Sequence, residues 1–157
     1  MPSTSAERAE RTRLSRDSVL QTALRLADRD GLDALTMRAL ADELGVEAMS
    51  IYYHLPNKNA ILDGAVEVVF AEIEAEVGGF GVPATTDAAN WAAALRKRIL
   101  GARSVLLRHP WAPWIMNARG APGPNATRHV DGMIHLTTSD FFVRGLDAAG
   151  RSAYLTL

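Results

Sequence analysis

The sequence predicts an all-α protein, and three observations support this fold class. Apolar residues recur at the three- and four-residue spacing of a helix along most of the 157 residues. No stretch sustains the alternation of apolar and polar residues that is typical of a strand. Glycines and prolines separate the periodic stretches, as expected where helices end.

Three short helices are expected to follow a flexible arm at residues 1–14. Ser15 and Thr36 are good N-caps, because their short side chains can accept a hydrogen bond from the first helical turn. Gly31 and Gly45 end the first two helices, because glycine adopts a left-handed backbone at low cost. The three helices are therefore predicted over residues 16–30, 37–44 and 47–54.

The remaining chain is expected to form longer helices on either side of one break. A helix over residues 58–77 is apolar on most of its circumference, so we expect other elements to cover it on several sides. The glycines and the proline of residues 78–83 break the chain after it. Further helices are predicted over residues 86–108, 125–136 and 146–157, with a short apolar element at 111–116 and an ambiguous stretch at 137–145. The predicted domains are an N-terminal helical domain at 15–60, a connecting helix at 61–77 and a C-terminal helical domain at 85–157.

The amino-acid composition excludes several classes of protein. The 48% apolar and 22% charged residues indicate a folded globular chain. The absence of cysteine excludes disulfides and cysteine-based metal sites, and no apolar run reaches the about 18 residues of a membrane helix. The polar N-terminus shows no secretory signal, so a cytoplasmic protein is expected. The net charge of −1 does not by itself indicate a nucleic-acid partner, so any cationic face must be local.

Residues 37–56 have the features of a helix-turn-helix. Two short helices meet at a turn that contains Gly45, and Ala41 is small where the two helices approach closely. Ile51 stands where the second helix of the pair must anchor in the core. Arg38 and Lys58 flank this helix, and each cation is able to neutralise a phosphate.

The second helix of this motif is predicted to present an uncharged face to solvent. At about 100° per residue the helix divides into an inner side, an outer side and two flanks: Ala48, Ile51 and Leu55 inside, Met49, Ser50 and Tyr53 outside, Tyr52 and His54 between. Exposed helix faces usually carry lysine and glutamate. Methionine or an aromatic edge suits a thymine methyl group, serine suits either type of base, and tyrosine or histidine suits a phosphate. The pattern therefore favours contact with a DNA major groove, with simple packing of the two tyrosines as the alternative.

Residues 15–77 resemble the DNA-binding region of the tetracycline-repressor (TetR) family. The resemblance rests on Leu35-Thr-Met-Arg-Ala-Leu-Ala-Asp-Glu-Leu-Gly-Val46, on Ser50-Ile-Tyr-Tyr-His-Leu-Pro-Asn-Lys58 and on Leu62-Asp63. From Trp91 onward the chain is similar, more weakly, to the C-terminal domains of that family through Arg103 and His109-Pro110-Trp111. The resemblance implies an all-α homodimer that represses transcription. A small molecule in the C-terminal domain would release it from its DNA operator.

The resemblance also implies which residues touch DNA. Carried over position by position, they are Thr36, Arg38, Ala48, Met49, Ser50, Tyr52, Tyr53, His54 and Lys58. Ala48 and Met49 lack side chains that form hydrogen bonds, which favours apolar or shape-based contacts at these two positions.

The C-terminal domain holds the candidates for a small-molecule site. An apolar pocket with a few polar groups could be lined by Trp91, Arg103, His109, Trp111, Trp114 and Met116, although each is also a plausible core residue. His129, Asp131 and His135 form a weak metal pattern, and neither a metal nor a cofactor is expected. No nucleophile motif, phosphate-binding loop or zinc-protease motif is present, so an enzyme is not expected.

The last segment has no C-cap, no basic last turn and no polar ending, so we expect that the natural chain, or its ancestor, continued past Leu157. The leading interpretation is a DNA-binding regulator that responds to a small molecule. The alternative is a truncated regulator that pairs with a full-length relative and has no regulated operator of its own.

Overall fold

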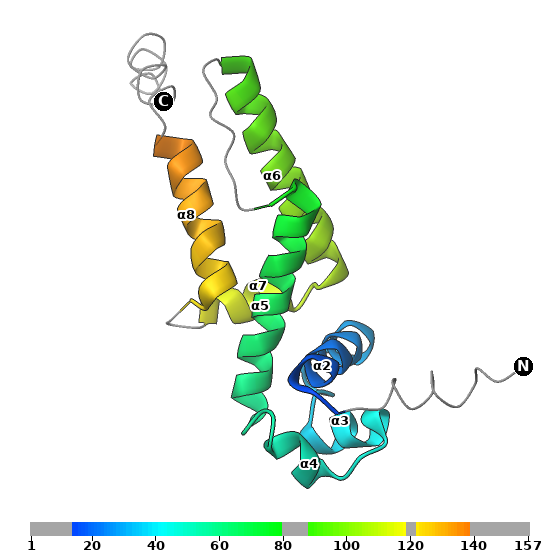
Figure 1. The fold of residues 1–157 in the computed structure, drawn as a ribbon. Helices are drawn as coiled ribbons and strands as arrows, with labels where there is room; N and C mark the ends of the chain where they lie inside the picture. Colours follow the sequence, from blue (N-terminus) through cyan, green and yellow to red (C-terminus); the bar gives the residue numbers. More distant parts are fainter. Residues whose placement is uncertain (1–13, 80–87, 119–121, 139–157) are drawn as a thin grey trace, which may run out of the picture. The chain divides into compact units, whose positions relative to one another are not determined.

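The computed structural model describes residues 14–79, 88–118 and 122–138, and every regular element in these ranges is a helix. The described helices are α2 (Arg16–Asp30), α3 (Met37–Leu44), α4 (Ala48–Tyr52), α5 (Lys58–Val77), α6 (Ala88–Arg108), α7 (Ala112–Ala118) and α8 (Pro124–Thr138) (Figure 1). The all-α fold class is confirmed. The helix predicted at 146–157, and the predicted arm except for its last residue, lie outside the described residues. None of the described helices combines the length and the apolarity that a membrane crossing requires.

Helix α2 begins at a reciprocal cap. Ser15 Oγ accepts a hydrogen bond from the Ser18 backbone N–H at 3.1 Å, and Ser18 Oγ accepts one from the Ser15 N–H at 2.9 Å. The two bonds satisfy donors that an isolated helix end leaves without partners. One side of the helix then enters the core through Val19, Leu20, Thr22, Ala23, Leu24, Leu26 and Ala27. The predicted bounds of this helix are confirmed.

Helix α3 is held at both ends by the residues that the sequence indicated. Thr36 Oγ1 accepts a hydrogen bond from the Ala39 N–H at 3.0 Å, which caps the N-terminus. Gly45 follows the last turn with φ of 67° in the left-handed region, where a side chain is disfavoured. The chain therefore leaves the helix after Leu44, and only three residues separate α3 from α4.

The chain divides into two compact units. The N-terminal unit comprises Met1–Val66 and His109–Met116, and the second unit comprises Glu67–Arg108 and Asn117–Leu157. The division falls within α5, and it places a segment of eight residues from beyond α6 with the N-terminal helices.

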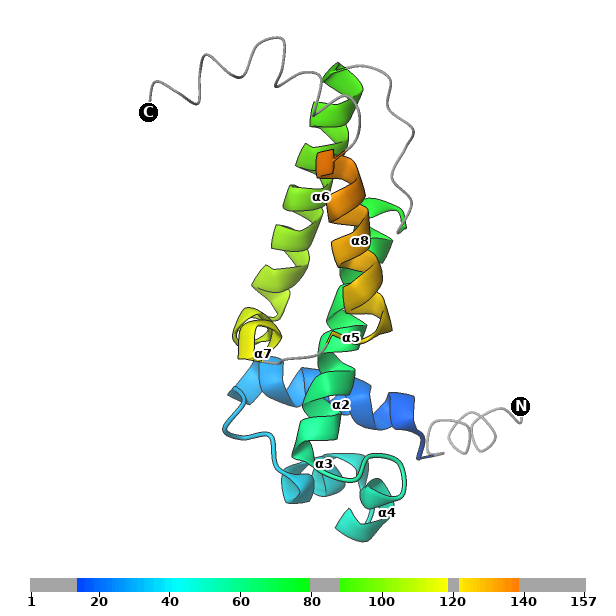
Figure 2. The same cartoon turned by 90° about the vertical axis from the view of Figure 1, so that its left-hand side faces the viewer.

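In the second unit, α6 and α8 both pack on α5. A Cβ atom at Gly101 of α6 would lie 2.6 Å from Val77 Cγ1, so only glycine permits this approach to α5. Figures 1 and 2 show α8 alongside α5, and hydrogen bonds described below join the two. Trp91 Nε1 of α6 donates to the Leu136 carbonyl of α8 at 2.7 Å. Three helices thus form the described core of this unit.

Candidate nucleic-acid interface

The turn between α3 and α4 is built from backbone hydrogen bonds. The Gly45 N–H donates to Asp42 O at 3.3 Å, and the Val46 N–H donates to Ala41 O at 3.0 Å. Ala41 is 4% exposed, consistent with its predicted place where the helices meet. These contacts fix the direction of α4 relative to α3.

Helix α4 is shorter than the predicted 47–54 and covers Ala48–Tyr52. The next residues form a turn in which the N–H groups of His54 and Leu55 both donate to Ile51 O at 2.9 Å. Proline at position 56 ends the turn, because it disfavours helical backbone at the residue before it. The difference is therefore one of helix length, and the chain keeps its direction through residue 55.

The inner side of α4 is anchored in the core. Ile51 is fully buried and Leu55 is 3% exposed. Full burial of an aliphatic side chain contributes about 1.5–3 kcal/mol. Ala48, predicted to point inward, is only half-buried, because it lies at the first turn beside solvent. Two side chains thus determine which face of this short helix points outward.

The outer side of α4 is exposed and uncharged. Tyr53 is 87% exposed, Met49 64% and Tyr52 41%, and Ser50 is half-buried between them. Single exposed apolar residues are common, but exposed apolar and aromatic groups that gather on one face can mark an interaction site. This side has the methyl, aromatic and hydroxyl groups that read base edges in a major groove.

The remaining predicted DNA contacts surround α4 in the N-terminal unit. Arg38 and His54 are exposed. Thr36 Oγ1 accepts the capping bond, which leaves its hydroxyl proton to donate to another group. Lys58 is half-buried, and its Nζ donates to the Leu32 carbonyl at 3.0 Å. An ammonium group has three donors, so this bond holds the cation in place without exhausting it.

One acidic residue of α3 is neutralised from α2. Arg29 Nη1 lies 3.3 Å from Glu43 Oε1, and Arg29 also pairs with Asp30 at 2.9 Å. Hydrogen bonds to Glu43 and, to a smaller extent, to Asp30 raise the pKa of Arg29 above its ordinary value. The pairing lowers the negative charge that a phosphate backbone would meet near α3.

The six candidate pocket residues fall into the two units. Trp91 and Arg103 belong to the second unit, and the others belong to the N-terminal unit: His109, Trp111, Trp114 and Met116. His109 and Trp111 are 6% and 7% exposed and both bind Asp28, while Trp114 is 75% exposed. The shared pocket stays a prediction.

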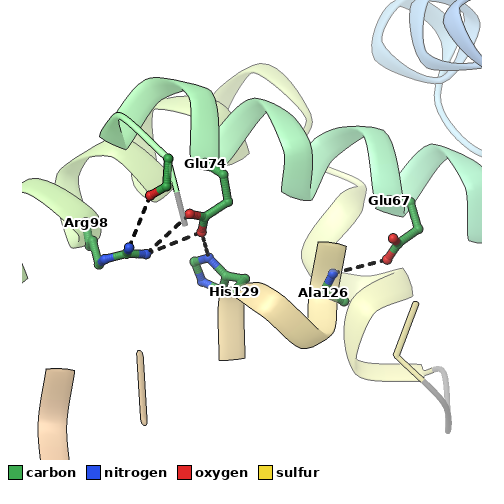
Figure 3. Close-up of polar contacts among 6 residues, drawn as sticks. Glu67, Glu74, Arg98, Ala126 and His129 are labelled. Atoms are coloured by element: carbon green, nitrogen blue, oxygen red, sulfur yellow. Dashed lines mark hydrogen bonds and ion pairs between the residues drawn. The ribbon is translucent and has the colours of Figure 1, made fainter. Parts of the chain in front are cut away.

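The structure adds a buried polar network that the sequence analysis missed. Glu74 of α5 is 2% exposed, and its Oε1 lies 3.3 Å from Arg98 Nη1 and 2.6 Å from His129 Nδ1 (Figure 3). Arg98 is 5% exposed and also donates to the Gly79 carbonyl at 3.2 Å. His129, considered above as a weak metal ligand, instead joins α8 to α5 through this carboxylate.

A second carboxylate of α5 caps α8. Glu67 accepts a hydrogen bond from the backbone N–H of Asn125 at 2.7 Å. It accepts a second from the backbone N–H of Ala126 at 3.2 Å (Figure 3). These are donors of the first helical turn, and a negative charge there complements the helix dipole. Glu67 and Glu74 are two of the five acidic residues of α5, and nothing in the local sequence distinguishes them from the other three.

Comparisons with known proteins agree with this geometry. The family described as bacterial regulatory proteins, tetR family, matches residues 19–65. An HTH-type transcriptional regulator of Saccharopolyspora erythraea is 37% identical over 146 residues, which cover 92% of this chain and 55% of the relative. The class D tetracycline repressor of Escherichia coli is 38% identical over 97 residues, covering 62% of this chain and 42% of the repressor.

Solved structures show the same fold. The structure of the Streptomyces coelicolor TetR family protein ActR in complex with (S)-DNPA matches with a TM-score of 0.65 and 29% identity, over 86% of this chain and 65% of ActR. The chain spans about half the length of the curated relatives described above. The family match assigns residues 19–65, which include the helix-turn-helix, to the tetR family of bacterial regulatory proteins, and the likeness to the Saccharopolyspora erythraea regulator extends over 92% of the chain.

Proposed function

We propose that the chain is a DNA-binding transcriptional regulator that reads its operator with the exposed face of α4. The observation that carries this proposal is the contrast between the two sides of one short helix. Ile51 is fully buried, while Tyr53 on the other side is 87% exposed and has no charged neighbour within α4. The family match over residues 19–65 supports the same function.

The nine residues named from the resemblance divide by chemistry. Met49, Ser50 and Tyr53 are assigned to base edges, because they occupy the outer side of the helix. The others are assigned to phosphates, register or shape: Thr36, Arg38, Ala48, Tyr52, His54 and Lys58.

Repression and release by a small molecule form the second part of the proposal. Relatives named tetracycline repressors support repression, and the ActR structure in complex with (S)-DNPA supports a small-molecule ligand. We place the site for such a ligand in the C-terminal part. Dimerisation and a cytoplasmic location complete the proposal, with the domains at 15–60, 61–77 and 85–157. The alternative, a partner of a full-length relative without an operator, is not favoured, because the matched relatives are themselves regulators and repressors.

Tyr53→Ala should weaken binding to the operator by about 1–3 kcal/mol, or about 5- to 150-fold, because a base-edge contact has this range. The operator is first obtained by selecting duplexes from a random library with the wild-type chain. Fluorescence anisotropy then measures the affinity of each variant. Tyr53→Phe separates the ring from the hydroxyl. Because the side chain is 87% exposed, neither substitution should alter unfolding. Equal binding of all three proteins to selected and random duplexes would contradict the assignment.

Lys58→Gln should reduce the slope of log affinity against log salt by about 1, because one phosphate contact fewer releases one counterion fewer. Glutamine keeps a donor for the Leu32 carbonyl, so the segment between α2 and α3 should keep its position. Arg108→Gln is the matched control, since it removes an exposed cation that pairs with Glu72 in the second unit. A slope that changes equally in both variants would remove Lys58 from the proposed interface.

A further inference from the structure

The geometry points to a clamp, formed by Asp28, His109 and Trp111, through which the second unit acts on the DNA-reading unit. We propose that Asp28 is the positioning residue of this clamp. The inference rests on the function proposed above, and it assigns the transmission of a signal to three side chains of the N-terminal unit.

One carboxylate receives both rings. His109 Nδ1 lies 2.9 Å from Asp28 Oδ1 and 3.0 Å from Oδ2, and Trp111 Nε1 lies 2.7 Å from the same Oδ1. An ionised carboxylate only accepts hydrogen bonds, so His109 has its proton on Nδ1 in this contact. The two rings stand edge to face with centroids 6.1 Å apart. Such charge-assisted bonds are stronger than neutral ones and orient both rings.

The two rings of the clamp are almost fully shielded from solvent. His109 is 6% exposed and Trp111 is 7% exposed, while the Asp28 side chain is 28% exposed. A buried ring N–H that loses its acceptor incurs a desolvation penalty. The segment His109–Met116 is therefore attached to α2 by this carboxylate as well as by packing.

Connectivity gives the clamp its role. His109 directly follows Arg108, the last residue of α6, and α6 lies in the second unit. A helix is stiff, so a displacement of α6 acts on His109 through consecutive backbone bonds. Asp28 stands on the last turn of α2, which packs against α3 in the helix-turn-helix. A shift of α6 is thus transmitted to α2, the helix that packs against the helix-turn-helix of α3 and α4.

The three tryptophans of the chain provide a test that needs no DNA. Trp111 reports the clamp, Trp91 reports the second unit through its bond to Leu136, and Trp114 is an exposed reference. NMR resolves the indole N–H of each and measures its exchange with solvent. Asp28→Asn should accelerate the exchange of Trp111 by about tenfold or more, as expected for the loss of a charge-assisted bond.

A substitution in α6 then tests transmission. Gly101→Ala adds a methyl group 2.6 Å from Val77 Cγ1 and should displace α6 while keeping a good helix former. The exchange of Trp111 should rise several-fold in this variant but not in the matched control Ser104→Ala, an exposed site on the same helix. The effect should vanish in an Asp28→Asn background. Unchanged Trp111 exchange in either Gly101→Ala or Asp28→Asn would overturn the clamp.

The duplex selected above links the clamp to function. Its addition to the wild-type chain should shift the Trp91 signal, because coupling between two sites is reciprocal. Asp28→Asn, and Trp111→Phe as a second variant that keeps the ring, should bind the duplex within about threefold of wild type but leave Trp91 unshifted. An equal Trp91 shift in wild type and both variants overturns the inference. If the wild-type chain binds no duplex, the proposed function is wrong. The exchange of the Trp111 indole N–H then still tests the clamp, because it needs no DNA.

Discussion

Ile51→Ala should lower the free energy of unfolding of the helix-turn-helix by about 2–5 kcal/mol, the range for truncating a buried isoleucine. Ile51 is 0% exposed and anchors a helix of only five residues, so no other part of α4 can replace its packing. Operator affinity should fall together with stability, because the outer face of α4 loses its fixed direction. Hydrogen exchange of the backbone amides of α2 to α4 measures the free energy of opening of these helices directly.

Met49→Ala is the matched control for this experiment. It truncates a side chain of similar size on the opposite side of the same helix, where the exposed fraction is 64%. We expect it to leave amide protection within about 0.5 kcal/mol of wild type, as exposed substitutions usually do, and to weaken operator binding alone. If Ile51→Ala and Met49→Ala change protection equally, the inner and outer sides of α4 have been assigned wrongly.

Glu74→Leu should destabilise the second unit by about 3–5 kcal/mol, because it removes one member of a buried ion pair and keeps the other charge inside. Leucine is close to glutamate in volume, so the loss is electrostatic and no large cavity is created. Arg98 is 5% exposed and His129 is held at 2.6 Å, so both lose a carboxylate partner in the interior. The exchange rate of the Trp91 indole N–H, which bridges α6 and α8, measures the change.

The double variant Glu74→Leu/Arg98→Met distinguishes a lost charge from lost packing. Removing both charges should recover most of the stability, since apolar replacements of buried pairs are often neutral or better. If the double variant is as unstable as Glu74→Leu, the unpaired charge of Arg98 is not the cause of the lost stability. Glu67→Gln offers a milder comparison on the same helix, because its amide oxygen can still cap α8.

The parts of the structure that the sequence predicted are those decided by neighbouring residues. Caps at Ser15 and Thr36, and the glycine stop at Gly45, act within one turn of the chain, so helix ends could be placed closely. The inner and outer sides of α4 followed from the period of a helix, because Ile51 and Leu55 stand one turn apart.

The polar pairs were not predictable, because they join residues far apart in the chain. Asp28 and Trp111 are 83 positions apart, and Glu74 and His129 are 55 positions apart. Periodicity assigns a side chain to a face but does not say which distant group will meet it. In an apolar helix such as α5, an acid on any face has the same local pattern whether it is solvated or buried.

The brevity of α4 has a consequence for substitutions on its two sides. A helix of five residues cannot nucleate by itself, so its existence depends wholly on the scaffold behind it. The outward side chains at positions 49 and 53 are mostly exposed and contribute little to that scaffold. If α4 reads DNA as proposed above, substitutions at Met49 and Tyr53 would change the DNA contacts at little cost in folding, whereas substitutions at Ile51 and Leu55 would affect folding first.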